Sequence, residues 1–181
     1  MNKAQLLVGV ASLVVASSAF AQGTFTLSNL NTTGRPLIYD RDGVTPIAGA
    51  NFLVDVLVKN PTSGNFEAVL RNGAAFTGVA PLSGNNAGLF NASGMSVPFI
   101  APGAGAELMV RAWDVTSGAS FSSALYKGDV VFTVAALGGA GTPPSLPATL
   151  ANFTSFALVP EPSTYALAAL GLGSLLLFRR K

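Results

Sequence analysis

The central part of the chain, residues 22–159, predicts an all-β domain built as a single antiparallel β-sandwich. Short apolar runs with strand-like alternation recur between turn residues, and helical periodicity is almost absent. Charged residues make up only 10% of the chain, whereas it has 20 glycines and 11 prolines. Strands that bury one face need a second sheet as partner, but the pattern leaves immunoglobulin-like and jelly-roll topologies both open.

Each expected strand is bounded by Gly, Pro, Asn, Asp or Ser, the residues that favour turns. The run 51–59 is the strongest, because the apolar residues at alternate positions from Phe52 to Val58 share one face. We expect a helical turn or a loop at 121–127 and a Gly/Pro-rich surface loop at 138–147. The strands are expected at 24–29, 36–40, 51–59, 66–71, 75–79, 88–91, 96–100, 107–115, 130–135 and 154–159.

The first 21 residues have the three parts of a cleavable signal peptide. Lys3 provides the positive start, and 6–15 form an apolar stretch that is too short to span a bilayer. Ala19 and Ala21 then fit the small-residue subsites of signal peptidase, so the mature chain is expected to begin at Gln22.

The last 22 residues, 160–181, have a different layout. The tripeptide Pro160-Glu161-Pro162 precedes an uncharged, mostly apolar run, and Arg179-Arg180-Lys181 closes the chain. We expect a transmembrane helix over 163–178, with its basic end in the cytoplasm and the rest of the chain outside.

In this order and at this terminus, these features resemble the PEP-CTERM sorting signal of Gram-negative bacteria. The resemblance covers about the last 23 residues and implies recognition by an exosortase, an integral-membrane enzyme similar to cysteine transpeptidases. Pro160, Glu161 and Pro162 would then be a substrate motif, and cleavage near them would release or transfer the protein toward the outer surface or exopolysaccharide. The alternative is a tail anchor that is never cut.

The basic character of the chain resides in its two ends. Lys3, Arg179, Arg180 and Lys181 are four of the ten basic residues, and Glu161 is one of the eight acidic ones. Residues 22–159 therefore carry six basic and seven acidic residues, a formal charge of −1. A domain without clustered Lys and Arg is not expected to bind nucleic acid.

Histidine and cysteine are both absent, which excludes a Ser-His-Asp triad, a cysteine nucleophile and a histidine-based metal site. No motif for a cofactor is present, so none is expected. Asp40 and Asp42 suggest a weak calcium site, with a plain turn as the favoured interpretation. A pair of acids acting as in glycosidases is the remaining catalytic option. The candidates are Asp40, Asp42, Asp55, Glu67, Glu107, Asp114 and Asp129.

The single tryptophan, Trp113, lies two residues after Arg111 in the expected strand 107–115. If both face solvent, they form a platform on which a sugar ring could stack. The alternative, which we favour, places Trp113 in the core between the sheets with Arg111 packed along it.

Together these features predict an exported, non-catalytic cell-surface or biofilm-matrix protein. Its expected partners are signal peptidase, an exosortase, the inner membrane through the C-terminal helix, and an exopolysaccharide. The first alternative is a carbohydrate-binding module, and the second is a small secreted hydrolase that uses carboxylates.

Overall fold

The structure, a computed structural model, describes residues 22–140 and 143–160. This part of the chain consists of short strands with one 3₁₀ turn, η1 (Gly84–Asn86), so the predicted all-β class is confirmed. The strands are β1 (Gly23–Ser28), β2 (Ile38–Tyr39), β3 (Phe52–Lys59), β4 (Phe66–Ala68), β5 (Leu70–Arg71), β6 (Ala74–Ala75), β7 (Asn91–Val97), β8 (Ala106–Asp114), β9 (Tyr126–Val134), β10 (Phe156–Ala157) and β11 (Val159–Pro160).

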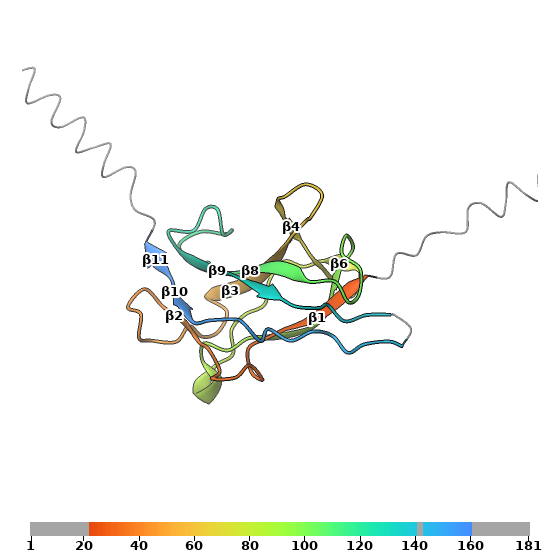
Figure 1. The fold of residues 1–181 in the computed structure, drawn as a ribbon. Coiled ribbons are helices and arrows are strands. Elements are labelled where there is room, and N and C mark those ends of the chain that lie inside the picture. The colour runs from red at the N-terminus through yellow and green to blue at the C-terminus, as the bar shows by residue number, and fades with distance from the viewer. Residues whose placement is uncertain (1–21, 141–142, 161–181) are drawn as a thin grey trace, which may run out of the picture.

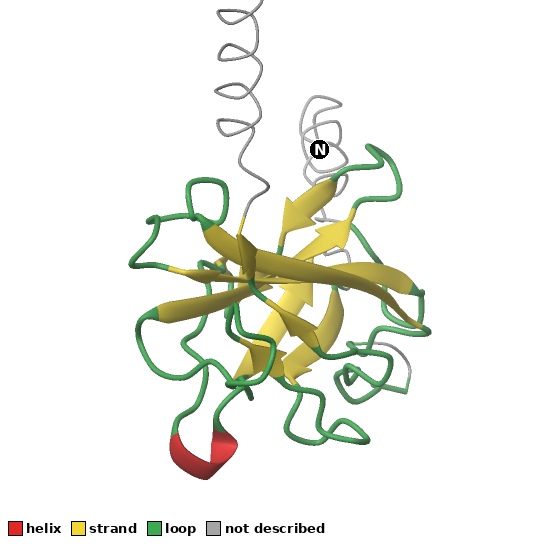
Figure 2. Ribbon diagram, turned by 90° about the vertical axis from the view of Figure 1, so that its left-hand side faces the viewer, coloured by secondary structure: helices red, strands yellow, loops and turns green. Residues whose placement is uncertain are grey.

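The strands form two antiparallel sheets and one short parallel pair (Figure 1). The larger sheet has the order β11-β9-β8-β3-β4, and the smaller one has the order β1-β7-β5-β6. β10 pairs with β2 in parallel. Figure 2 shows that the long strands cross one another in projection and that loops surround them.

Both antiparallel sheets contribute side chains to one hydrophobic core. On β3 the predicted inward face is confirmed, because Val54, Val56 and Val58 are buried and Phe52 packs against them. Across the core lie apolar residues of the smaller sheet, among them Phe25 on β1. Removing this apolar surface from water is the main favourable contribution to folding. The other members from the long strands are Leu27, Ala92, Met95, Val97, Ala106, Leu108, Val110, Ala112, Phe132 and Val134.

The segment that follows the 138–147 loop belongs to the same core. Phe153 is buried, and its ring meets the edges of Phe90, Phe132 and Phe156 at centroid distances of 5.5, 5.7 and 6.2 Å. Leu158 is completely buried close to the end of the described chain. The C-terminal residues of the domain therefore complete its hydrophobic core.

Several expected strands differ from the structure in their bounds. The run 66–71 divides at the buried Val69, because β4 pairs with β3 in one sheet and β5 pairs with β7 in the other. A single strand, β7, replaces the end of the run 88–91 and the beginning of 96–100. β9 begins at Tyr126, within the segment expected to be a turn or loop.

No helix in the part of the chain that the structure describes is long and apolar enough to cross a membrane. The signal peptide, residues 1–21, and the expected transmembrane helix over 163–178 lie outside the described residues.

Candidate functional sites

Arg111 and Trp113 lie on the face of β8 opposite the core, because the alternate positions Leu108, Val110 and Ala112 point inward. Arg111 is paired with Asp55 of the neighbouring strand β3, directly opposite in the register. Its Nε donates to Asp55 Oδ1 at 2.9 Å and its Nη2 donates to Oδ2, which makes the ion pair bidentate. The guanidinium group of Arg111 is therefore already bound to Asp55 within the domain.

Trp113 is only 4% exposed although it faces away from the core. The edge-on ring of Phe121 lies 6.2 Å from it, and the Arg111 guanidinium and Lys127 ammonium groups lie 4.7 and 5.2 Å from the centre of the Phe121 ring. The burial of Trp113 agrees with the placement that we favoured, but the indole lies on the face of β8 away from the core and not between the sheets. The loop that follows β8 covers the indole, so Trp113 has no open face on which a sugar could stack.

Asp40 and Asp42 lie in the turn before Thr45, and their carboxylates bind the turn's own backbone. Asp42 Oδ1 accepts hydrogen bonds from the Val44 and Thr45 amides at 2.9 and 2.8 Å, and Oδ2 accepts one from the Thr45 hydroxyl at 2.5 Å. The Thr45 hydroxyl, together with these amides, lowers the pKa of Asp42. This is the hydrogen bonding of an Asx turn, and no group of three acidic, His or Cys side chains that could hold a metal occurs among residues 22–140 and 143–160.

Three of the other candidate carboxylates also have local partners. Glu107 forms an ion pair with Lys59, with 3.0 Å between Oε2 and Nζ. Glu67 accepts hydrogen bonds from Ser63 and Asn60, which lower its pKa, with Ser63 the larger cause. Asp114 Oδ1 accepts from the amide and hydroxyl of Thr116. Asp129 lies opposite Arg111 on β9.

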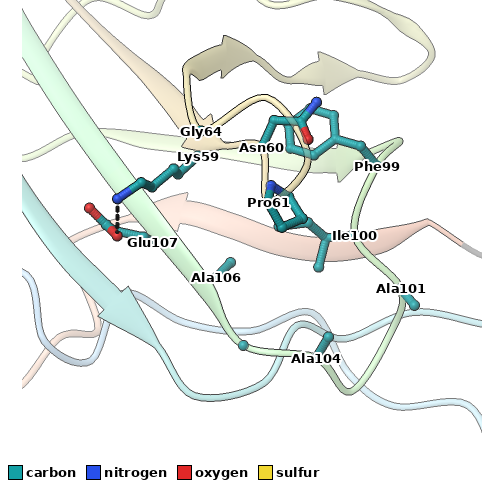
Figure 3. Close-up of a pocket in the computed structure, with 11 residues that line it drawn as sticks. Lys59, Asn60, Pro61, Gly64, Phe99, Ile100, Ala101, Ala104, Ala106 and Glu107 are labelled. Carbon is teal, nitrogen blue, oxygen red and sulfur yellow. Dashed lines mark hydrogen bonds and ion pairs between the residues drawn. The ribbon is translucent and has the colours of Figure 1, made fainter.

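A pocket of about 440 Å³ lies where β3 ends and β8 begins (Figure 3), and we call it the β3–β8 pocket. Phe99, Ile100 and Pro61 supply much of its apolar wall, and the Lys59–Glu107 ion pair also lines it. Such a pocket suits a ligand with an apolar face and hydrogen-bonding groups at its edge. Its other lining residues are Asn60, Gly64, Ala101, Ala104, Gly105 and Ala106.

Sequence reasoning missed the β3–β8 pocket because three separate segments build it and none contains a motif. The turn after β3, the connection from β7 to β8 and the start of β8 meet only in the folded chain. The one local signal is the turn Asn60-Pro61-Thr62-Ser63-Gly64, which by itself indicates only a strand boundary.

The structure places one residue of the predicted sorting motif. Pro160 is the last described residue, and it pairs with Tyr126 at the edge of the larger sheet as part of β11. Gln22 is the first described residue. The remaining predicted residues of the two signals, Ala19, Ala21, Glu161, Pro162, Arg179, Arg180 and Lys181, lie outside the described residues.

Residues 158–181 match the family model of the PEP-CTERM protein-sorting motif. The resemblance found in the sequence is therefore confirmed: the chain carries this motif at its C-terminus. The motif implies export, transient membrane anchoring and processing by an exosortase. No curated protein and no solved structure matches the chain.

Proposed function

We propose that this chain is an exported, non-catalytic protein of the cell surface or exopolysaccharide matrix, delivered there by an exosortase. The observation that carries the proposal is the PEP-CTERM motif at 158–181, which begins within the last residues of a folded all-β domain. A chain built this way consists of a folded cargo domain and a C-terminal sorting signal that directs its delivery.

The proposed route uses both ends of the chain. Signal peptidase removes residues 1–21 and leaves Gln22 as the first residue. The apolar run over 163–178 then holds the chain in the inner membrane, and the positive charge of Arg179, Arg180 and Lys181 keeps the C-terminus in the cytoplasm. An exosortase recognises Pro160-Glu161-Pro162 and separates the cargo from the membrane helix.

The proposed cargo is a single β-sandwich over 22–159. Its support is the core to which both antiparallel sheets contribute, with β3 and β8 on one side and β1 and β7 on the other. Sandwiches of this kind present loops at both ends, a common arrangement for surface proteins.

A structural rather than catalytic role is supported by the carboxylates. Glu107 is the one acidic residue among those that line the β3–β8 pocket, and it is paired with Lys59. A glycosidase of the usual kind needs two carboxyl groups on opposite sides of its substrate.

The sorting function is tested by Glu161→Gln. This change keeps length, prolines and hydrophobic run, so membrane insertion should be unaffected while recognition by the exosortase is lost. We expect uncut protein to accumulate in the inner membrane, measured by fractionation and immunoblotting of cells that contain the sorting enzyme. Glu67→Gln, the same chemical change within the domain, is the matched control and should be sorted normally.

A tail that is only an anchor would give a different result. The Glu161→Gln variant and a Pro160→Ala/Pro162→Ala double variant would then be localised like the wild-type chain, because insertion into a bilayer does not depend on the tripeptide. That outcome would contradict the proposed function.

A second candidate function, saccharide binding, is favoured by the β3–β8 pocket. Phe99 provides an aromatic face for a sugar ring, while Lys59 and Glu107 can exchange hydrogen bonds with its hydroxyl groups. We expect Phe99→Ala to reduce retention of the domain in affinity gels that contain the cells' own exopolysaccharide, while Phe121→Ala, a change far from the pocket, leaves it unchanged. Equal retention of both variants would contradict a sugar site in this pocket.

A further inference from the structure

The larger sheet has an outer face, which is turned away from the core. Residues directly opposite one another on neighbouring strands share a face, so the register of the strands arranges this outer face in rows across the sheet. Leu57, Met109 and Val131 form the middle row, and Ala68 of β4 extends it to a fourth strand. We call these four residues the apolar row. Val131 is 43% exposed, although the solvent face of an antiparallel sheet is usually polar.

A charged row lies on each side of the apolar row, two residues further along the strands. Each charged row contains one ion pair between β3 and β8. In the first row the acid is on β3 and the base on β8, whereas in the second row this order is reversed. The members are Asp55, Arg111 and Asp129 in the first row, and Lys59, Glu107 and Thr133 in the second.

The reversed order makes the outer face complementary to a second copy of itself. When one copy is turned by 180° about a line along the apolar row, each strand faces its own counterpart and the two charged rows exchange places. Opposite charges then meet on β3 and on β8, and like charges meet nowhere in these rows. The facing pairs are Arg111 with Glu107, Asp55 with Lys59, and Asp129 with the uncharged Thr133.

The loop that rises above the outer face fits the same half-turn. The Phe121 ring packs on Trp113, which is four residues along β8 from Met109. The half-turn therefore places the ring opposite Gly105 of the second copy, four residues from Met109 in the other direction. Gly105 has no side chain and lines the β3–β8 pocket, so the raised ring meets a hollow in the facing surface.

We propose that a second copy of this chain packs on the outer face of the larger sheet, with apolar row against apolar row about a two-fold axis. The three rows cover about 13 Å along the strands and about 14 Å across four strands. An interface of this size is small, so the dimer is weak and forms where the protein is concentrated. A covalent trap is therefore the suitable test.

The trap uses one cysteine on the axis, in a chain that has no other. Packed sheets lie about 10 Å apart, so a short bis-maleimide rather than a disulfide should join Val131→Cys to its own counterpart. A membrane-permeant reagent, added to cells that produce the full chain, gives a result that does not depend on where the chain is delivered. The matched control is Val44→Cys, because Val44 is 75% exposed in a turn away from this face. We expect a cross-linked dimer for Val131→Cys only, and equal cross-linking of both variants would overturn the proposal.

An exchange of charges tests the orientation of the two copies. Lys59→Glu/Glu107→Lys, added to Val131→Cys, keeps the net charge and the ion pair within the domain. Across the axis, however, the new lysine faces Arg111 and the new glutamate faces Asp55. We expect about tenfold less cross-linked dimer, because like charges now meet at the interface. A further exchange, Asp55→Arg/Arg111→Asp, makes the facing charges opposite again and should restore cross-linking.

Thr133 provides the same test at an exposed position, should the exchanged residues impair folding. It faces Asp129 of the second copy, so Thr133→Lys should increase the cross-linked fraction and Thr133→Asp should reduce it. Melting temperatures near that of the Val131→Cys parent would show that both changes act on association and not on the fold. Cross-linking that is the same in the two Thr133 variants, or undiminished in the folded Lys59→Glu/Glu107→Lys variant, would overturn the dimer.

Discussion

Val56, Val110 and Val130 lie side by side at the centre of the larger sheet, on β3, β8 and β9. Val56 is 2% exposed and Val110 is completely buried. Val131 follows Val130 in sequence but points to the opposite face of the sheet, where it is 43% exposed. Neighbouring valines of one chain thus offer two environments for the same substitution.

Val56→Asp should unfold the domain or reduce its free energy of unfolding by about 3–5 kcal/mol, because a carboxylate at this position would be buried without a partner. Val131→Asp introduces the same charge into water and should cost less than about 1 kcal/mol. Thermal and urea unfolding of residues 22–160, followed by circular dichroism, measures both. Similar melting temperatures for the two variants would contradict the assignment of the buried face.

Other single residues show where sequence reasoning stops. The inward face of β3 could be predicted because alternation is a local property of the strand. Asn29 could not, although it is completely buried: its amide donates to the Pro36 and Gly88 carbonyls and its oxygen accepts from the Phe90 amide. These partners are up to 61 residues away, so no local pattern reveals them.

The same distinction holds at the scale of strands. The long strands β3 and β8 were predicted within one residue at each end, because their alternation is uninterrupted. β7 was predicted as two runs, since Asn91–Gly94 contains little apolar surface and its strand conformation depends on pairing with β1 and β5. A strand held mainly by its neighbours leaves a weak signal in its own sequence.

The last strands show how a short element can matter for function. β10 and β11 each have two residues and read together as one run, 154–159. In the structure they pair with different partners, β2 and β9, on either side of the buried Leu158. This change of partner holds the start of the sorting motif against the sheet.

Across the whole molecule, the two ends of the described chain lie at opposite ends of the domain (Figure 1). Gly23 donates its amide to the carbonyl of Ile100, a residue of the β3–β8 pocket. The C-terminal strand pairs with Lys127, which in turn lies opposite Trp113. Trp113 is six residues along β8 from Glu107, about 20 Å in a strand.

The net charge of the molecule reports which ends have been removed. The full chain has a formal charge of +2 and an isoelectric point near 9.2. Loss of the signal peptide removes only Lys3 and gives +1. A cut after Glu161 and before Arg179 removes the three basic tail residues as well, which leaves six basic and eight acidic residues, or −2.

We therefore expect the protein recovered from the cell surface to focus below pH 7, while the membrane-bound intermediate focuses above it. Isoelectric focusing with immunodetection separates these species. Because the protein has so few ionisable groups, the loss or gain of each charge shifts its isoelectric point by a measurable amount. Glu161→Gln protein should remain in the basic range, because its tail is not removed. Surface material that focuses in the basic range would show that the tail is kept, and a wild-type surface species of −1 rather than −2 would place the cut before Glu161.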